Sequence, residues 1–167
     1  MMKIDFENFV EYHKNPDKKY TIDEMEDIRA NEFAMHLMCP TMYVLEEFLL
    51  ANLDFEKLNN LYFYDKYKFY ETLFNRFGIP IEVICIKIDE LSDKYKDSNV
   101  KIEDIILADF FYLYDDKNIS LKEALTICFP KSHEILEKYI KDNYSFKAHT
   151  KVKKCKVIFE KNKLLNN

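Results

Sequence analysis

Asp27 and Asn31 are the side chains whose types and spacing first suggest chemistry in this sequence. Four residues apart, they lie one turn apart on the same side of a helix. A carboxylate and an amide beside an apolar helix face are costly to bury unless they are paired, hydrogen-bonded or bound to a metal. The pair therefore indicates either a metal-binding position or a hydrogen-bonded helix surface.

A helix that starts near Thr21 or Asp23 and ends near Pro40 must position this pair. At about 100° per residue, the pair lies at the border of an apolar stripe that we expect the helix to bury. That stripe consists of Ala30, Phe33, Ala34 and Leu37. His36 points to the opposite side, which we expect to be solvated, so it is a poor candidate for a metal ligand.

The stretch DIRANEFAMHLMCP, residues 27–40, resembles the helix E-x-x-A-N-x-F-A-x-x-L-x-x-P of the ImmA/IrrE-like zinc metallopeptidases. The matching residues are Ala30, Asn31, Phe33, Ala34, Leu37 and Pro40. The resemblance continues through PTMYVLEEFL and the helix-turn-helix-like segment LFNRFGIPIEVICIKIDEL, and covers roughly residues 5–92. It implies a zincin-like domain, in which an H-E-x-x-H helix supplies two His ligands and a Glu base, and an acidic residue at the position of Asp27 supplies the third ligand.

The sequence departs from that family at its catalytic helix, because no H-E-x-x-H occurs anywhere. A short helix over DFENFVEYHKN stands in its place. Both imidazole positions are lost, whether Glu7 is aligned with the catalytic Glu or His13 with a trailing His. The residues found there are Phe6 and Val10 in the first alignment, Asp5 and Phe9 in the second. Asp27 is also one methylene shorter than the family's Glu, which matters at metal–oxygen distances near 2 Å.

The resemblance thus implies a catalytically inactive pseudoenzyme without a cofactor. It would act as a regulatory module that binds a protein, such as a transcriptional regulator of a mobile element, phage or stress response. One alternative is an active zinc metallopeptidase that cleaves a regulator. Its zinc site would use Asp27, His13 and Glu7, the last as catalytic base, or would be completed by another chain. A further alternative is a gene fragment that begins after a lost His-containing helix.

Composition limits the other classes of function. The chain has 167 residues, 48% of them apolar and 33% charged, which is enough for a packed core. Glycine occurs once, at Gly78, so neither a P-loop nor a dinucleotide-binding fingerprint is present. The four cysteines form no C-x-x-C pair, and no signal peptide or membrane-length apolar run is visible. We therefore expect a cytoplasmic protein with reduced thiols that does not enter a membrane.

The pattern of apolar residues predicts a mainly α fold: a zincin-like helical domain over 1–96 and a helical extension over 97–167. TKVKKCKVIFEK, residues 150–161, alternates with period two and could form a short C-terminal strand. The aromatic helix over 61–77 is typical of core, although a stacking platform is an alternative. Lys147–Lys163 belongs to a basic tail of charge +6 that leaves −11 for the first 146 residues. Nucleic acid is therefore an expected partner only through this tail, which could equally dock on its own domain.

Overall fold

The computed structural model describes residues 5–95, 100–114 and 119–143. Its regular elements over these ranges are α-helices, so the predicted mainly α fold is confirmed. None of the described helices is long and apolar enough to cross a membrane. The predicted C-terminal strand and the basic tail lie outside the described residues.

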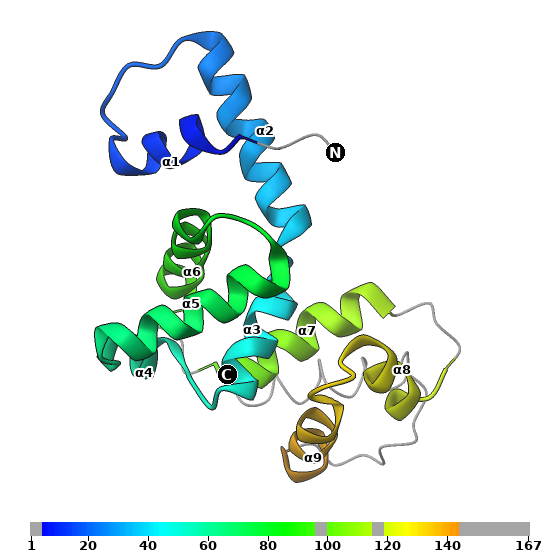
Figure 1. Cartoon of the computed structure of the whole chain (residues 1–167). Helices are drawn as coiled ribbons and strands as arrows, with labels where there is room; N and C mark the ends of the chain where they lie inside the picture. Colours follow the sequence, from blue (N-terminus) through cyan, green and yellow to red (C-terminus); the bar gives the residue numbers. More distant parts are fainter. Residues whose placement is uncertain (1–4, 96–99, 115–118, 144–167) are drawn as a thin grey trace. The chain divides into compact units, whose positions relative to one another are not determined.

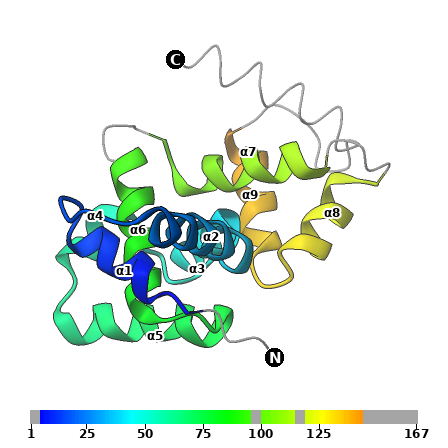
Figure 2. The same ribbon diagram turned by 90° about the horizontal axis from the view of Figure 1, so that it is seen from above.

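The chain divides into two compact units, which are drawn in Figures 1 and 2. Unit 1 comprises Met1–Val44 and Asp54–Asn99, and unit 2 comprises Leu45–Leu53 and Val100–Asn167. The units therefore differ from the predicted domains, because Leu45–Leu53 groups with the later part of the chain. That segment holds the apolar end of α3 (Thr41–Leu50), whose Leu45 and Phe48 are fully buried.

Unit 1 is built from helices that pack around a small apolar core. Its complete helices are α1 (Glu7–Lys14), α2 (Ile22–Met38), α4 (Phe55–Asn60), α5 (Phe63–Phe77) and α6 (Ile81–Tyr95). α1 packs against α2 and α6, and α5 packs against α6. Figure 1 shows α1 beside α2 and α5 beside α6. The buried side chains include Phe9 of α1, Leu73 of α5 and Val83 of α6. This arrangement places the predicted motif helix, α2, beside the short helix that was expected to replace the catalytic one.

Local signals explain where these helices begin and end. Thr21 caps α2 with a capping box, in which its hydroxyl accepts from the Glu24 N–H and the Glu24 carboxylate accepts from the Thr21 N–H. α5 ends at Gly78, whose φ of +67° is a left-handed conformation that glycine adopts without steric cost. Pro80 then precedes the first turn of α6. The prediction that the motif helix starts near Thr21 or Asp23 is confirmed.

α4 was not predicted, because its six residues FEKLNN are too few for a periodic pattern. Its signal was nevertheless present in the sequence. Asp54 is the N-cap residue, and its carboxylate accepts a hydrogen bond of 2.7 Å from the Lys57 N–H. Leu58 is the one side chain of this helix that is buried.

Unit 2 contains α7 (Ile102–Tyr114), α8 (Leu121–Cys128) and α9 (His133–Asn143), together with Leu45–Leu53. Its core combines aliphatic side chains with a cluster of phenylalanine rings. The ring of Phe110 lies 5.2 Å from that of Phe111 and 5.8 Å from that of Phe129, measured between centroids. Ser132 and Glu46 are both buried, and the Ser132 hydroxyl donates a hydrogen bond of 2.7 Å to the Glu46 carboxylate. This bond ties the α3 segment to the start of α9.

Candidate functional site

α2 buries a different side from the one that its motif predicted. Its buried side chains are Ile28, Asn31 and Met35. The stripe expected to be buried is largely exposed: Phe33 and Leu37 keep 70% and 69% of their surface open to solvent, Ala30 is exposed and Ala34 is half-buried. The prediction was wrong because α2 carries apolar residues on two opposite sides, and periodicity alone cannot choose between them.

Asp27 lies on the surface of α2 and has found a hydrogen-bond donor. The side-chain amide of Asn8, on α1, donates a bond of 3.0 Å to the Asp27 carboxylate. The sequence gave no indication that Asn8 would be this partner. The bond joins α1 to α2 at the place where the resemblance puts a third metal ligand.

Asn31 is buried in place of the carboxylate, with only 5% of its surface exposed. Its side-chain nitrogen has no hydrogen-bond partner among the described residues. A buried donor without an acceptor costs about 1–3 kcal/mol. Buried Asn31 therefore lowers the free energy of unfolding, whereas the Asp27 carboxylate has a hydrogen-bond partner.

Glu7 and His13 stand at opposite ends of α1 and face solvent. The backbone N–H of Glu7 donates a bond of 3.0 Å to the Asp5 carboxylate, which caps the first turn. The His13 ring packs edge-on against Phe9, with centroids 4.6 Å apart. His13 belongs to the exposed last turn of α1. Phe6 and Phe9, which stand at the lost ligand positions, are buried, while Val10 is half-buried.

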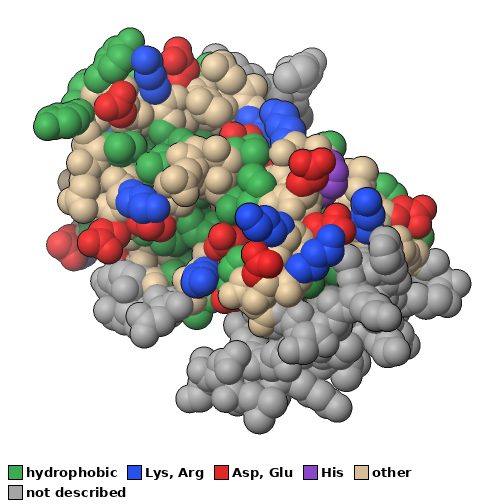
Figure 3. All heavy atoms as spheres, turned by 90° about the horizontal axis from the view of Figure 1, so that it is seen from below, with side chains coloured by type: hydrophobic (Ala, Val, Ile, Leu, Met, Phe, Trp, Pro, Cys, Tyr) green, Lys and Arg blue, Asp and Glu red, His purple; other side chains and the backbone are tan. Residues whose placement is uncertain are grey.

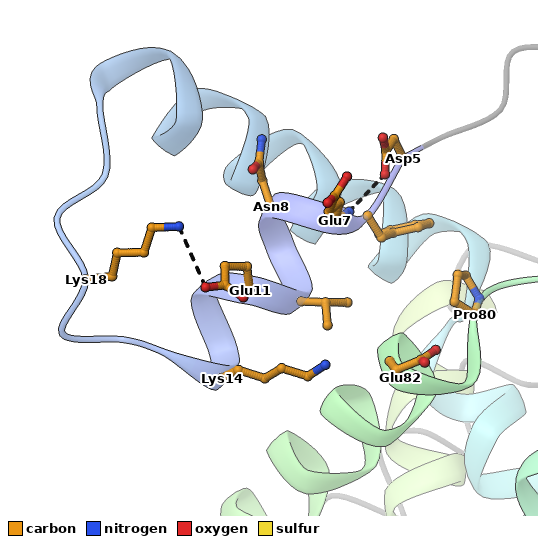
Figure 4. A pocket seen from close by; sticks show the side chains of 10 residues that line it. Asp5, Glu7, Asn8, Glu11, Lys14, Lys18, Pro80 and Glu82 are labelled. Carbon is orange, nitrogen blue, oxygen red and sulfur yellow. Dashed lines mark hydrogen bonds and ion pairs between the residues drawn. The ribbon is translucent and has the colours of Figure 1, made fainter.

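A recess of about 710 Å³ lies between α1 and the start of α6 (Figure 4). Four carboxylates and two ammonium groups line it, beside Phe6, Asn8, Val10 and Pro80; the charged residues are Asp5, Glu7, Glu11, Glu82, Lys14 and Lys18. Figure 4 shows Lys14 extending from α1 towards Glu82, and Lys18 lying 3.7 Å from the Glu11 carboxylate. The recess is thus an open groove of mixed charge.

The residues near α1 and α2 do not fit a zinc ion. Across the described ranges, no group of three or more His, Cys, Asp or Glu side chains is placed to hold a metal. Asp27 is engaged by Asn8, and His13 packs on Phe9. A zinc site needs about four ligand atoms at roughly 2.0–2.3 Å, so Glu7, His13 and Asp27 form no such set in this fold.

A second polar contact of α2 was missed in the sequence. Lys87 of α6 is almost wholly buried, with 2% of its surface exposed, and its Nζ lies 2.7 Å from Nδ1 of His36. His36 is exposed, as expected, and the contact of its ring with this ammonium group is an addition that the sequence did not indicate. Lys87 occupies an apolar position of the α6 pattern, and that position was the only available signal of its burial.

Cys39, at the end of α2, completes this buried region. Burial raises the pKa of the Cys39 thiol to about 11, although the positive charges of Lys87 and Arg76 act in the opposite direction. Such a thiol is protonated near neutral pH and is a poor nucleophile. We therefore assign Cys39 to the packing of unit 1.

Comparison of the chain with family models, curated proteins and solved structures finds no match. The resemblance of residues 27–40 to the ImmA/IrrE-like motif therefore stays a prediction, as do the zincin-like detail of the fold and the roles that it implies for Glu7, His13 and Asp27.

Proposed function

We propose that this protein is a regulatory module that binds another protein through the outer side of α2. The observation that carries the proposal is the exposure of Phe33 and Leu37, which keep 70% and 69% of their surface open. Both belong to the stretch that resembles the peptidase motif, as does the exposed Ala30, one turn before Phe33. We call Ile22, Ala30, Phe33 and Leu37 the outer face of α2.

The outer face has the spacing of a helix that packs against a partner. Its four residues follow one another at intervals of eight, three and four, which places them within about 80° on a helical wheel. Removing a large apolar side chain from water contributes about 1.5–3 kcal/mol. Two such side chains next to each other therefore favour binding to an apolar surface of another protein.

The charges around this face indicate what the partner should carry. Glu26 lies in the middle of the stripe and is exposed. We therefore expect an amphipathic helix of the partner, whose apolar side holds a lysine or arginine opposite Glu26. A regulator protein of a mobile element, phage or stress response, in the cytoplasm, is the class that the motif resemblance suggests.

A photo-crosslinking experiment tests this proposal. Replacing Phe33 with the photoreactive residue p-benzoylphenylalanine, in the source cell, should give an adduct with one partner protein. Leu37→Glu in the same chain should abolish that adduct, because a carboxylate would enter the apolar contact. The matched control places the same photoreactive residue at position 127, where Ile127 is also exposed but lies on α8.

The outcome depends on the contrast between the two positions. An adduct that forms at position 33, is lost with Leu37→Glu and is not seen at position 127 supports the proposal. Equal adducts at both positions, or none at position 33, would contradict it.

The active metallopeptidase is the alternative, and no geometry of the described residues favours it. Zinc counting separates the two. The purified chain is incubated with excess Zn²⁺, freed of unbound metal and analysed by elemental mass spectrometry. We expect no stoichiometric zinc in the native chain or in Asp27→Ala. Close to one zinc per native chain, lost in Asp27→Ala, would favour the peptidase instead.

A further inference from the structure

α5 carries the most prominent aromatic surface of the described residues. Five of its aromatic side chains, counting the N-cap residue, are exposed: Tyr62, Phe63, Tyr64, Tyr67 and Phe74. Phe63 alone keeps 86% of its surface open to solvent. Figure 3 shows one side of the molecule, on which hydrophobic side chains lie open among charged ones. A surface of this kind usually marks a contact with another molecule.

The central residues of this surface form a narrow stripe. At about 100° per residue, Phe63, Tyr67, Tyr70 and Phe74 fall within an arc of about 60°. Phe69 and Leu73 point to the other side of α5 and are buried in unit 1. Tyr70 lies at the edge of the stripe and is half-buried. α5 therefore buries one side in its own unit and presents an aromatic stripe on another.

The order of residues in the stripe is symmetric about its midpoint, so two antiparallel copies of the stripe can face each other. Phe63 and Phe74 are equally far from its midpoint, and so are Tyr67 and Tyr70. Two antiparallel copies related by a two-fold axis would set Phe63 of each against Phe74 of the other, and Tyr67 against Tyr70. Aromatic pairs of this kind add about 0.5–1.5 kcal/mol beyond the area that they bury.

The charges beside the stripe match the same arrangement. Lys68 and Glu71 are both exposed and lie on the same flank of α5. In an antiparallel two-fold pair, like flanks meet, and Lys68 of one copy lies about 3 Å along the axis from Glu71 of the other. Two symmetric ion pairs would therefore border the aromatic contact. Within one chain, the Lys68 ammonium lies 4.4 Å from the centre of the Tyr64 ring, on this same flank.

We propose that a second copy of this chain binds the aromatic stripe of α5 in this antiparallel manner. An aromatic side chain has about 150–250 Å² to bury, so the eight side chains of two facing stripes supply roughly 800 Å² at half burial. Specific interfaces begin at about 1,200 Å². The association is therefore weak and concentration-dependent, and it uses a surface separate from the outer face of α2.

Analytical ultracentrifugation over a range of concentrations tests the surface. The native chain should pass from the mass of one chain to that of two as its concentration rises. Phe63→Glu should remain a single chain at every concentration, and Tyr67→Glu should do the same. Phe33→Glu is the matched control: an exposed phenylalanine of the same unit, replaced in the same way, should leave association unchanged.

Charge exchange tests the antiparallel arrangement. Lys68→Glu and Glu71→Lys should each weaken association by roughly tenfold, because like charges then meet twice in every pair. The double variant should associate like the native chain, since each ion pair is restored with its charges exchanged. Circular dichroism should show native helix content in all these variants, because the changed side chains are exposed.

Several results would overturn the proposal: a native chain that stays single at all concentrations, a pair that survives Phe63→Glu, or a double variant as weak as the single ones. Loss of the pair in Phe33→Glu would also overturn it, because the contact between copies would then involve α2. The partner adduct at position 33 does not depend on any of these results, so the two proposals can fail separately.

Discussion

Units 1 and 2 place the same kinds of aromatic side chain in opposite environments. In unit 2, the rings of Phe48, Phe110, Phe111 and Phe129 are fully buried. In unit 1, Phe9 and Phe69 are buried, but Phe33 and Phe63 are among the most exposed large side chains of the described residues. These four rings of unit 2 therefore form part of its core, whereas unit 1 leaves a large share of its described aromatic side chains exposed.

The contrast teaches that residue type alone does not separate core from contact surface in this protein. α2 buries Asn31 and exposes Phe33, two residues further along the same helix. Such an inversion leaves a polar group in the interior and an apolar one in water, and both raise the free energy of the isolated chain. A partner that covers the apolar side would offset part of this cost, which is consistent with the binding function proposed for unit 1.

The largest effect should come from removing a ring of unit 2. Phe110→Ala should lower the free energy of unfolding by about 3–5 kcal/mol, because it leaves a cavity between Phe111 and Phe129. Phe63→Ala in unit 1 should change it by no more than about 0.5 kcal/mol, because that ring packs on little of its own chain. Urea titrations of both variants make the comparison. Similar losses would mean that Phe63 is covered within the chain.

An intermediate effect should appear at alkaline pH in unit 1. The Cys39 thiol keeps its proton to about pH 11 when folded, against an ordinary pKa of 9.0. Between these values the unfolded chain binds fewer protons, so the free energy of unfolding falls as pH rises, by on the order of 2–3 kcal/mol.

Cys39→Ala provides the control for this pH dependence. In this variant the free energy of unfolding should decrease less between pH 8 and pH 11 than in the native chain. Urea titration at each pH measures it. If the free energy of unfolding falls equally in the native chain and in Cys39→Ala, burial does not raise the pKa of the Cys39 thiol.

A smaller effect, of opposite sign, is expected at Asn31. Asn31→Leu should raise the free energy of unfolding by about 1–2 kcal/mol, because it replaces an unsatisfied buried donor with an apolar group of similar size. Asp27→Leu should bring no gain, since the Asp27 carboxylate is exposed and bonded to Asn8. Thermal or urea unfolding of the two variants measures the difference. A loss of stability in Asn31→Leu would mean that the Asn31 amide has a partner in solution.

The candidate site was only partly predictable. The sequence correctly predicted a helix across the motif, because a helix follows from apolar spacing within a short segment. The Asn8–Asp27 and His36–Lys87 contacts join residues that are 19 and 51 positions apart. No local pattern encodes which helices meet or at what angle, so neither contact could be foreseen.

The sequence by itself determined the helices and most of their ends. Thr21 and Ser120 offer hydroxyl caps, Gly78 permits the left-handed stop, and Pro80 suits a first turn, so these boundaries rest on chemistry within a few residues. Only the tertiary structure decided which sides of α2 and α5 are buried. Both helices are apolar on more than one side, so the side that enters the core depends on the helices available to cover it. The outer face of α2 and the aromatic stripe of α5 are what this packing leaves exposed.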